Sequence, residues 1–111
     1  MDFQNQFTKT TTDANLMETV QHGSTEYPFR YYYENIALFD FKCIDWHWHS
    51  ELEFIYIKSG NVSFDVGEIH FELNEGNGIM INSKILHRLQ SSSDAIIPNF
   101  LFQPSFIAPQ D

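Results

Sequence analysis

The amino-acid sequence predicts an all-β domain, either a sandwich or a barrel, and three observations lead to this fold class. Short apolar or alternating segments recur about every 8–12 residues, the spacing typical of such folds. Turn-forming clusters of Gly, Asn and Ser separate these segments, and no long helical periodicity interrupts them. Aromatic residues make up 16% of the 111 residues, and their side chains suit strands and a large buried area.

Residues 1–28 are predicted to form a polar N-terminal arm, and residues 29–111 to form the barrel. The arm is rich in Thr and Asn, so its start is expected to be flexible or loosely docked. It allows one short helix over residues 13–21, with Asp13 as the N-cap. His22 follows this segment and is interpreted as a histidine exposed to solvent.

The first strands of the barrel are predicted between short polar breaks. Residues 29–33 are strongly aromatic and β-prone, and residues 36–42 form a second apolar run after the break Glu34-Asn35. A third strand is predicted within residues 45–60, where the turn signal Ser59-Gly60-Asn61 ends it.

Two alternating segments follow and predict a hairpin. Residues 62–66 place apolar side chains on one face and polar side chains on the other, and residues 69–73 repeat this pattern. Gly67-Glu68 supplies the turn between them. His70 lies opposite the apolar face and is expected to face solvent.

The last strands are short and are separated by polar turns. Residues 79–81 are wholly apolar, residues 85–90 form the next segment, and residues 96–102 form the last apolar run. Pro98 has no main-chain N–H to donate, so it favours an edge strand or a strand start. Pro104 is expected to end this run.

The charge balance limits the partners of this sequence. Asp and Glu number 15 against 6 Lys and Arg, which gives a net charge of −9. Such a surface repels the phosphates of nucleic acids and anionic membranes, so neither is expected to bind directly. Cys43 is the single cysteine and cannot form an internal disulfide. Neither an export signal nor an apolar run of about 18 residues is found, so a cytoplasmic location is expected.

One stretch carries the residues that suggest chemistry. His47, His49 and Glu53 share the same parity, so an extended chain would direct all three to one face of a sheet. Two imidazoles and a carboxylate on one face are a typical start of a metal site. Glu51 and Ile55 have the same parity, so this inward set could also line a pocket for a small molecule.

The same stretch resembles the first sequence motif of the cupin superfamily. His47-X-His49-X3-Glu53-X6-Gly60 reproduces that motif, except that Phe41 stands where the family has its leading glycine. This resemblance implies a double-stranded β-helix, which is a small jelly-roll barrel.

A second motif of that superfamily is matched in spacing further along the chain. Gly76 and His87 are in place, whereas the expected proline, second glycine and final asparagine are replaced by Asn82, Lys84 and Ser91. With His87, the resemblance implies a complete donor set of three imidazoles and one carboxylate. This set suits Zn, Ni, Mn or Fe and consists of His47, His49, Glu53 and His87.

A closer resemblance covers roughly Gly23 to Ala108 and points to the N-terminal sensor domain of AraC-type bacterial transcriptional regulators. In that family the cupin barrel holds or senses a small effector, often a sugar. A later helical region dimerises, and a C-terminal pair of helix-turn-helix motifs binds the promoter. No recognition helix or basic patch is found in these 111 residues. The resemblance is carried by Tyr27–Tyr32, Trp46–Glu53, Asn74–Ser83 and Pro104–Ala108.

Two functions are therefore expected, and the first is favoured. It is a regulatory, non-enzymatic domain that requires no cofactor, allows a homodimer and reaches DNA only through a C-terminal region outside this sequence. The second is a stand-alone metal-dependent cupin enzyme of the isomerase or oxygenase type, with its ion at the four-residue donor set. A purely structural dimerisation module has only the aromatic content in its favour. In the favoured function, a sugar or other small effector binds at His47, His49, Glu51, Glu53, Ile55 and His87.

Overall fold

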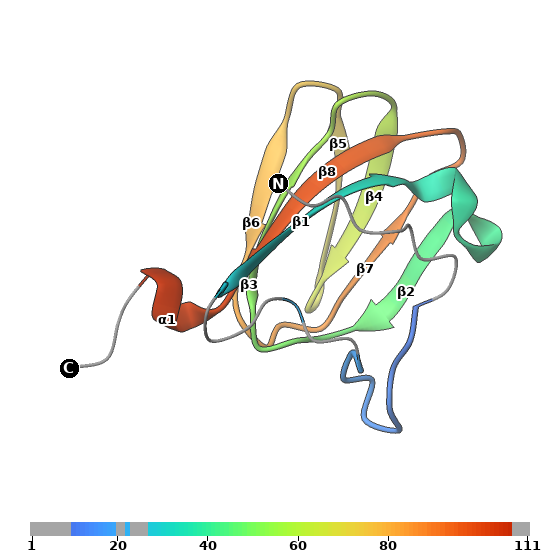
Figure 1. The fold of residues 1–111 in the computed structure, drawn as a ribbon. Coiled ribbons are helices and arrows are strands. Elements are labelled where there is room, and N and C mark those ends of the chain that lie inside the picture. The colour runs from blue at the N-terminus through green and yellow to red at the C-terminus, as the bar shows by residue number, and fades with distance from the viewer. Residues whose placement is uncertain (1–9, 20–21, 23–26, 108–111) are drawn as a thin grey trace.

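The computed structural model describes residues 10–19, 22 and 27–107, and within them eight strands form two antiparallel four-stranded sheets. The sheets face each other as a jelly-roll barrel (Figure 1), which confirms the predicted all-β fold and double-stranded β-helix. In order across it, the first sheet contains β1 (Phe29–Asn35), β8 (Ile96–Phe102), β3 (Leu52–Tyr56) and β6 (Gly78–Ile81). The second contains β2 (Cys43–His47), β7 (His87–Gln90), β4 (Asn61–Val66) and β5 (Ile69–Asn74).

A short helix, α1 (Pro104–Ile107), follows β8 and lies outside the two sheets (Figure 1). Pro104 therefore ends the last strand, as predicted. In the described ranges of the chain, no helix is long and apolar enough to cross a membrane.

The predicted hairpin is confirmed. β4 pairs with β5 along its whole length, and Gly67 occupies the turn with a φ of 59°. Val62 and Phe64 face the interior and are fully buried. His70 points away from the core, as expected, and its Nδ1 lies 2.7 Å from a carboxylate oxygen of Asp65.

The strand predicted over residues 36–42 is wrong, because this segment forms two 3₁₀ turns, η1 (Ile36–Leu38) and η2 (Asp40–Lys42). The side chain of Asn35 accepts a hydrogen bond from the main chain two residues on, which caps the first turn at the end of β1. Ile36 and Phe39 are buried in the core. The apolar residues therefore anchor turns, although their pattern is that of a strand.

The strand predicted within residues 45–60 is also wrong as a single element. The chain forms β2, leaves that sheet over residues 48–51 and enters the opposite sheet as β3. In this break the main chain of Trp48 bonds to Leu16 and Glu18 of the arm instead of to a neighbouring strand. The alternation read from the sequence is present within each strand but does not run through both.

The predicted strands at residues 85–90 and 96–102 form with two differences. β7 begins only at His87, after Lys84 has adopted a left-handed φ of 64°. Pro98 lies near the start of β8, but β8 is not an edge strand, because it lies between β1 and β3. The ladder with β3 ends at Asn99, so the missing N–H of Pro98 falls outside that ladder.

The helix expected over residues 13–21 does not form over its described part, residues 13–19. The carboxylate of Asp13 accepts main-chain hydrogen bonds from Asn15 at 2.8 Å and from Met17 at 3.0 Å, which closes a tight turn. Leu16 has a φ of 66°, which a right-handed helix does not permit. Residues 20 and 21 lie outside the described part of the chain. The turn lies at one end of the barrel, in blue in Figure 1.

The interior of the barrel changes from polar to apolar along its strands. On β3, Glu53 is followed on the same face by Ile55, and on β7, His87 is followed by Leu89. The apolar positions form one core between the sheets, so the polar positions collect at the other end. The core consists of Ile36, Phe39, Ile44, Ile55, Ile57, Val62, Phe64, Ile81, Leu89, Ala95 and Ile97.

We expect Gly60→Ala to lower the free energy of unfolding more than Gly67→Ala does. Both glycines have positive φ, 86° and 59°, so each alanine carries a left-handed cost of about 1–2 kcal/mol. Only at Gly60 would a Cβ meet the main chain, 2.5 Å from the carbonyl oxygen of Asp94, whereas nothing lies within 4 Å at Gly67. Urea unfolding should show an additional loss of about 1–3 kcal/mol for Gly60→Ala. Equal losses would contradict this packing.

Candidate functional site

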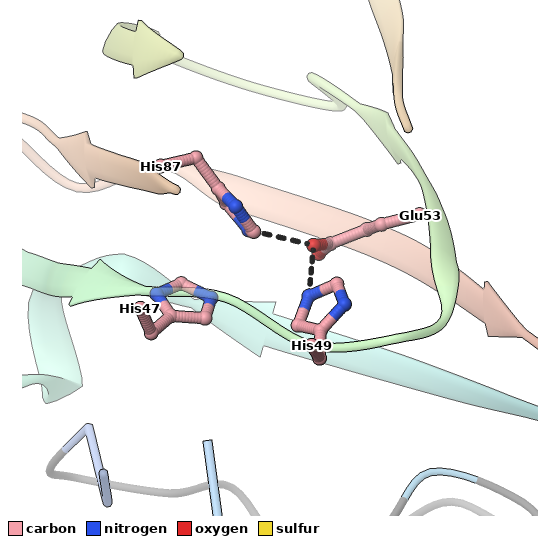
Figure 2. A group of neighbouring side chains, drawn as sticks. All are labelled: His47, His49, Glu53 and His87. Atoms are coloured by element: carbon pink, nitrogen blue, oxygen red, sulfur yellow. Dashed lines mark hydrogen bonds and ion pairs between the residues drawn. The ribbon is translucent and has the colours of Figure 1, made fainter. Parts of the chain in front are cut away.

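Four of the predicted site residues meet inside the barrel, between its two sheets (Figure 2). His47 ends β2, His49 lies in the connection that follows, Glu53 is on β3, and His87 begins β7. One ligand atom from each lies within 4.8 Å of the others, and all four residues are buried. They reach this centre from both sheets and a connection, and not from one face of one strand as the parity argument assumed.

Main-chain carbonyl groups orient the three imidazoles. Nδ1 of each ring donates to a carbonyl oxygen two residues away, at 2.7 Å for His47 and His87 and at 3.0 Å for His49. The local path of the chain therefore sets each ring. Because Nδ1 is occupied, Nε2 is the atom that each ring has free for the centre of the cluster.

Glu53 is the electrostatic centre of the cluster. Its Oε1 lies 3.1 Å from Nε2 of His49 and 3.2 Å from Nε2 of His87 (Figure 2). Burial raises the pKa of the Glu53 carboxyl, but these two hydrogen bonds outweigh burial and hold the pKa well below its usual range. Burial lowers the pKa of His49, and the Glu53 carboxylate reverses this and raises it to about 9. For His47, burial and the neighbouring His87 imidazole lower the pKa to about 4.

The donor set fits a divalent transition metal. His49 and His87 each bond through Nδ1 to a main-chain carbonyl and direct Nε2 at the Glu53 carboxylate. A divalent ion could bind both Nε2 atoms without disturbing the Nδ1 hydrogen bonds. Zn, Ni, Mn or Fe would suit the ligands His47, His49, Glu53 and His87.

A cavity lies between this cluster and the N-terminal arm. Its volume is about 40 Å³. Thr10, Thr11 and Glu18 of the arm line it on one side. The barrel side includes three cluster residues, His47, His49 and Glu53, together with Tyr32, Glu34 and Asn99. The arm therefore forms part of the wall of the site.

His22 is buried with 3% of its surface exposed, so its interpretation as a solvent-exposed histidine is wrong. Its Nδ1 lies 2.7 Å from the hydroxyl oxygen of Tyr32, its Nε2 bonds to Glu18, and its main-chain N–H donates to Glu51. The ring also meets the ring of His49 edge-on. Tyr32 and Glu51 approach His22 only in the folded chain, so the sequence carried no local signal of this burial.

Three residues predicted to bind a ligand lie behind the cavity wall, namely Glu51, Ile55 and His87. Glu51 is buried, accepts the hydrogen bond from His22 and places Oε1 3.9 Å from Nδ1 of His49. Ile55 is fully buried in the apolar core. None of the three lines the cavity, but Glu51 and His87 contact residues that do, His49 and Glu53.

Glu34 and Asn99 are polar lining residues that the sequence analysis missed. They lie on the inner faces of β1 and β8, where Nδ2 of Asn99 donates to Oε1 of Glu34 at 2.7 Å. Burial raises the pKa of Glu34 to about 7, although this hydrogen bond opposes the rise. A signal was present for Asn99, since it is polar and stands in the middle of the apolar run 96–102.

The jelly-roll barrel with three buried imidazoles and a carboxylate defines this chain as a cupin domain, and solved structures have the same fold. A cupin-2 domain containing protein from Shewanella frigidimarina has a TM-score of 0.59 and 13% identity, over 68% of this chain and 72% of that one. Bacillus subtilis oxalate decarboxylase, a protein with Mn(II) centers, has a TM-score of 0.52 and 21% identity, over 58% of this chain and 19% of that one.

Comparison of the sequence with family models identifies a narrower family within this fold. A family model of the AraC-like ligand binding domain matches residues 38–108, and the chain belongs to that family. A relative from Bacillus subtilis (strain 168), the uncharacterized HTH-type transcriptional regulator YdeC, is 33% identical over 101 residues. The alignment covers 89% of this chain and 35% of YdeC, so the chain spans about a third of that relative. Both resemblances read from the sequence are confirmed.

We expect Zn²⁺ or Ni²⁺ to raise the unfolding temperature of the protein and His87→Ala to abolish this rise. An ion that binds only the folded state adds about 2.7 kcal/mol at a hundredfold excess over its Kd. His70→Ala is the matched control, because His70 is exposed on β5 and pairs with Asp65 outside the cluster. Thermal unfolding of metal-free protein, with and without each ion, measures the effect. A rise that survives in His87→Ala would place the ion elsewhere.

Glu34→Gln should change how stability depends on pH. The folded state holds the pKa of Glu34 at about 7, against 4.5 for an unperturbed carboxyl, so ionisation is harder in the folded protein. The wild type therefore loses on the order of 3 kcal/mol between about pH 4.5 and about pH 7, with no further loss above that range. The variant should lack this loss in urea unfolding series at stepped pH. A stability difference that is the same at every pH would argue against a buried ionising Glu34.

Proposed function

We propose that this chain is the effector-sensing domain of an AraC-type transcription regulator, and that it binds a small molecule without converting it. The observation that carries this proposal is the shared wall of the cavity, with His47, His49 and Glu53 of the barrel on one side and Glu18 and His22 of the arm on the other. A molecule bound there contacts both parts at once. Membership of the AraC-like ligand binding domain family and the similarity to an HTH-type regulator support the proposal.

The effector would act through the position of the arm. The main-chain N–H of Trp48 donates to Leu16 at 3.0 Å, and its carbonyl oxygen accepts from Glu18 at 2.8 Å. Its indole N–H donates to Asn15 at 3.0 Å. Together with the bonds of His22 to Tyr32 and Glu51, these bonds hold the arm at the barrel. A ligand that touches Glu18 or His22 therefore changes the balance between docked and released arm. The rest of the regulator would respond to that balance.

The same proposal covers the other partners. DNA would be bound by a region outside this chain, because a net charge of −9 repels phosphates and because YdeC extends far beyond the aligned part. Sugars are one effector class to screen, since their hydroxyls can bond to the carboxylates and imidazoles that line the cavity. A cytoplasmic location and a homodimeric regulator belong to this proposal as well.

A metal-dependent enzyme is the second candidate, and the donor set of the cluster favours it. A bound ion supplies Lewis-acid chemistry when one of its coordination positions is open to substrate. In such an enzyme, Glu18 and Glu34 would accept protons during turnover. They are the carboxylates outside the cluster that line the cavity. Turnover by metal-loaded protein that disappears in His87→Ala would favour this function over sensing.

We expect an effector to slow hydrogen exchange in the arm. Screening by thermal unfolding identifies ligands, because a molecule that binds only the folded state raises the unfolding temperature. With such a ligand, exchange of the Glu18 amide, which donates to Trp48, should slow several-fold. The Gly67 amide, which donates to Leu86 in the β4–β5 hairpin region, serves as the internal control and should not change.

Trp48→Phe extends this experiment, because it removes the indole bond to Asn15 and keeps an aromatic ring. The variant should bind the same ligand more weakly and show less protection at Glu18. A ligand that stabilises the protein but leaves the Glu18 amide unchanged would separate binding from the arm. If no small molecule of any class raises the unfolding temperature, the sensing function itself is rejected.

A further inference from the structure

The cavity has a second polar group apart from the four-residue cluster. Glu34 on β1 and Asn99 on β8 are 8% and 2% exposed, and both line the cavity. In the β1–β8 register, Glu34 lies opposite Ile97 and Asn99 lies opposite Tyr32. The two side chains are therefore diagonal neighbours on the inner face of one sheet, a placement that lets polar side chains interact directly.

Two acceptors fix the orientation of the Asn99 amide. Its Nδ2 donates to Oε1 of Glu34 at 2.7 Å and to the main-chain oxygen of Ile97 at 2.9 Å. Because a carboxylate and a carbonyl only accept, the nitrogen of the amide must face them. Oδ1 of Asn99 must then point the other way.

This arrangement leaves two oxygens, Oε2 of Glu34 and Oδ1 of Asn99, without a hydrogen bond in the described part of the chain. Among those same residues, no enclosed side-chain nitrogen or oxygen lacks a partner. The two oxygens therefore cannot be enclosed in protein and must be open to the cavity that their residues line. Two hydrogen-bond acceptors thus face the same space.

The carboxylate of Glu34 also has no positive partner within hydrogen-bond distance among the described residues. The lining of the cavity contains neither Lys nor Arg. His22 acts on Glu34 through its charge, but its ring bonds to Tyr32 and Glu18. The carboxylates of Glu53 and Glu18 add negative charge around Glu34. A buried carboxylate without a counter-ion is unfavourable, which is consistent with the raised pKa of Glu34.

We infer that Glu34 and Asn99 form a subsite for a primary ammonium group, so the effector is a small molecule that carries an amine. This inference rests on the proposed function, because it takes the effector to occupy this cavity. An ammonium group has three N–H donors and a positive charge, so it can bond to both free oxygens and supply the missing counter-ion. A carboxylate or phosphate would meet two acceptors and be repelled. A neutral hydroxyl has one donor and leaves an oxygen unpaired.

Probes that share a carbon skeleton and differ in charge test this preference. One set is 2-aminoethanol, ethylene glycol and glycolate, and a larger set is glucosamine, glucose and glucuronate. Thermal unfolding and calorimetry on wild-type protein, kept in one metal state throughout, should show the amine of at least one set binding about tenfold or more tightly than its hydroxyl counterpart. A screen of further amine-bearing metabolites completes the probe panel.

Three variants connect the preference to the subsite. Glu34→Gln keeps the size of the side chain and removes the charge, so the amine and the hydroxyl should bind it about equally. Glu34→Asp keeps the charge and should retain the preference for the amine. Glu72→Gln makes the same chemical change at an exposed position on β5 and should behave like the wild type. If Glu34→Gln does not fold, the wild-type ratio and Glu34→Asp still decide the result.

Several results would overturn the inference. These are equal binding of amine and hydroxyl, tighter binding of the carboxylate, no binding by any amine in the panel, or an amine preference that survives Glu34→Gln. If neutral or anionic members bind while amines do not, the sensing function stands and only this inference fails. If no member of any charge class binds, both are rejected.

Discussion

A single buried carboxylate, that of Glu53, links the two sheets at the polar end of the barrel. It projects from β3 and bonds to His87 on β7 of the opposite sheet and to His49 in the connection between β2 and β3. A charge in this position is tolerable only when donors surround it, because an unpaired buried carboxylate would strongly destabilise the fold. Residues 48–51 connect β2 to β3 and belong to neither strand. This connection lets His49 approach Glu53 from outside both strand ladders.

Features set by residues close together in the sequence were predictable. Alternation predicted β4 and β5, and the motif spacing brought His87 to the three site residues of the opening stretch. The failures have tertiary causes. Residues 36–42 look like a strand, but the Asn35 cap and burial of Ile36 turn the chain. The interruption after β2 depends on hydrogen bonds to the arm, which no local pattern records.

The burial and pairing of the polar cavity residues could not be predicted from the local sequence. A histidine in a polar arm has the same local surroundings whether it is exposed or buried, and His22 is buried only because Tyr32 and Glu51 lie where it docks. Glu34 lies near the end of β1, and in the sequence it looks like part of a polar break. Only the fold brings Asn99, from the other end of the domain, beside it. The chemistry of such a site depends on pairs of residues far apart in sequence.

β1 pairs with β8 along its whole length, from Phe29 opposite Phe102 to Asn35 opposite Ile96. The first sheet therefore cannot be completed until the ribosome has released the segment around residue 102, because pairing between the two ends of a chain is a late and slow event. The wall of the cavity made by Glu34 and Asn99 forms at that same moment. A nascent chain that has not yet closed this sheet has no complete pocket, so the cavity cannot hold a ligand before synthesis has passed the last strand.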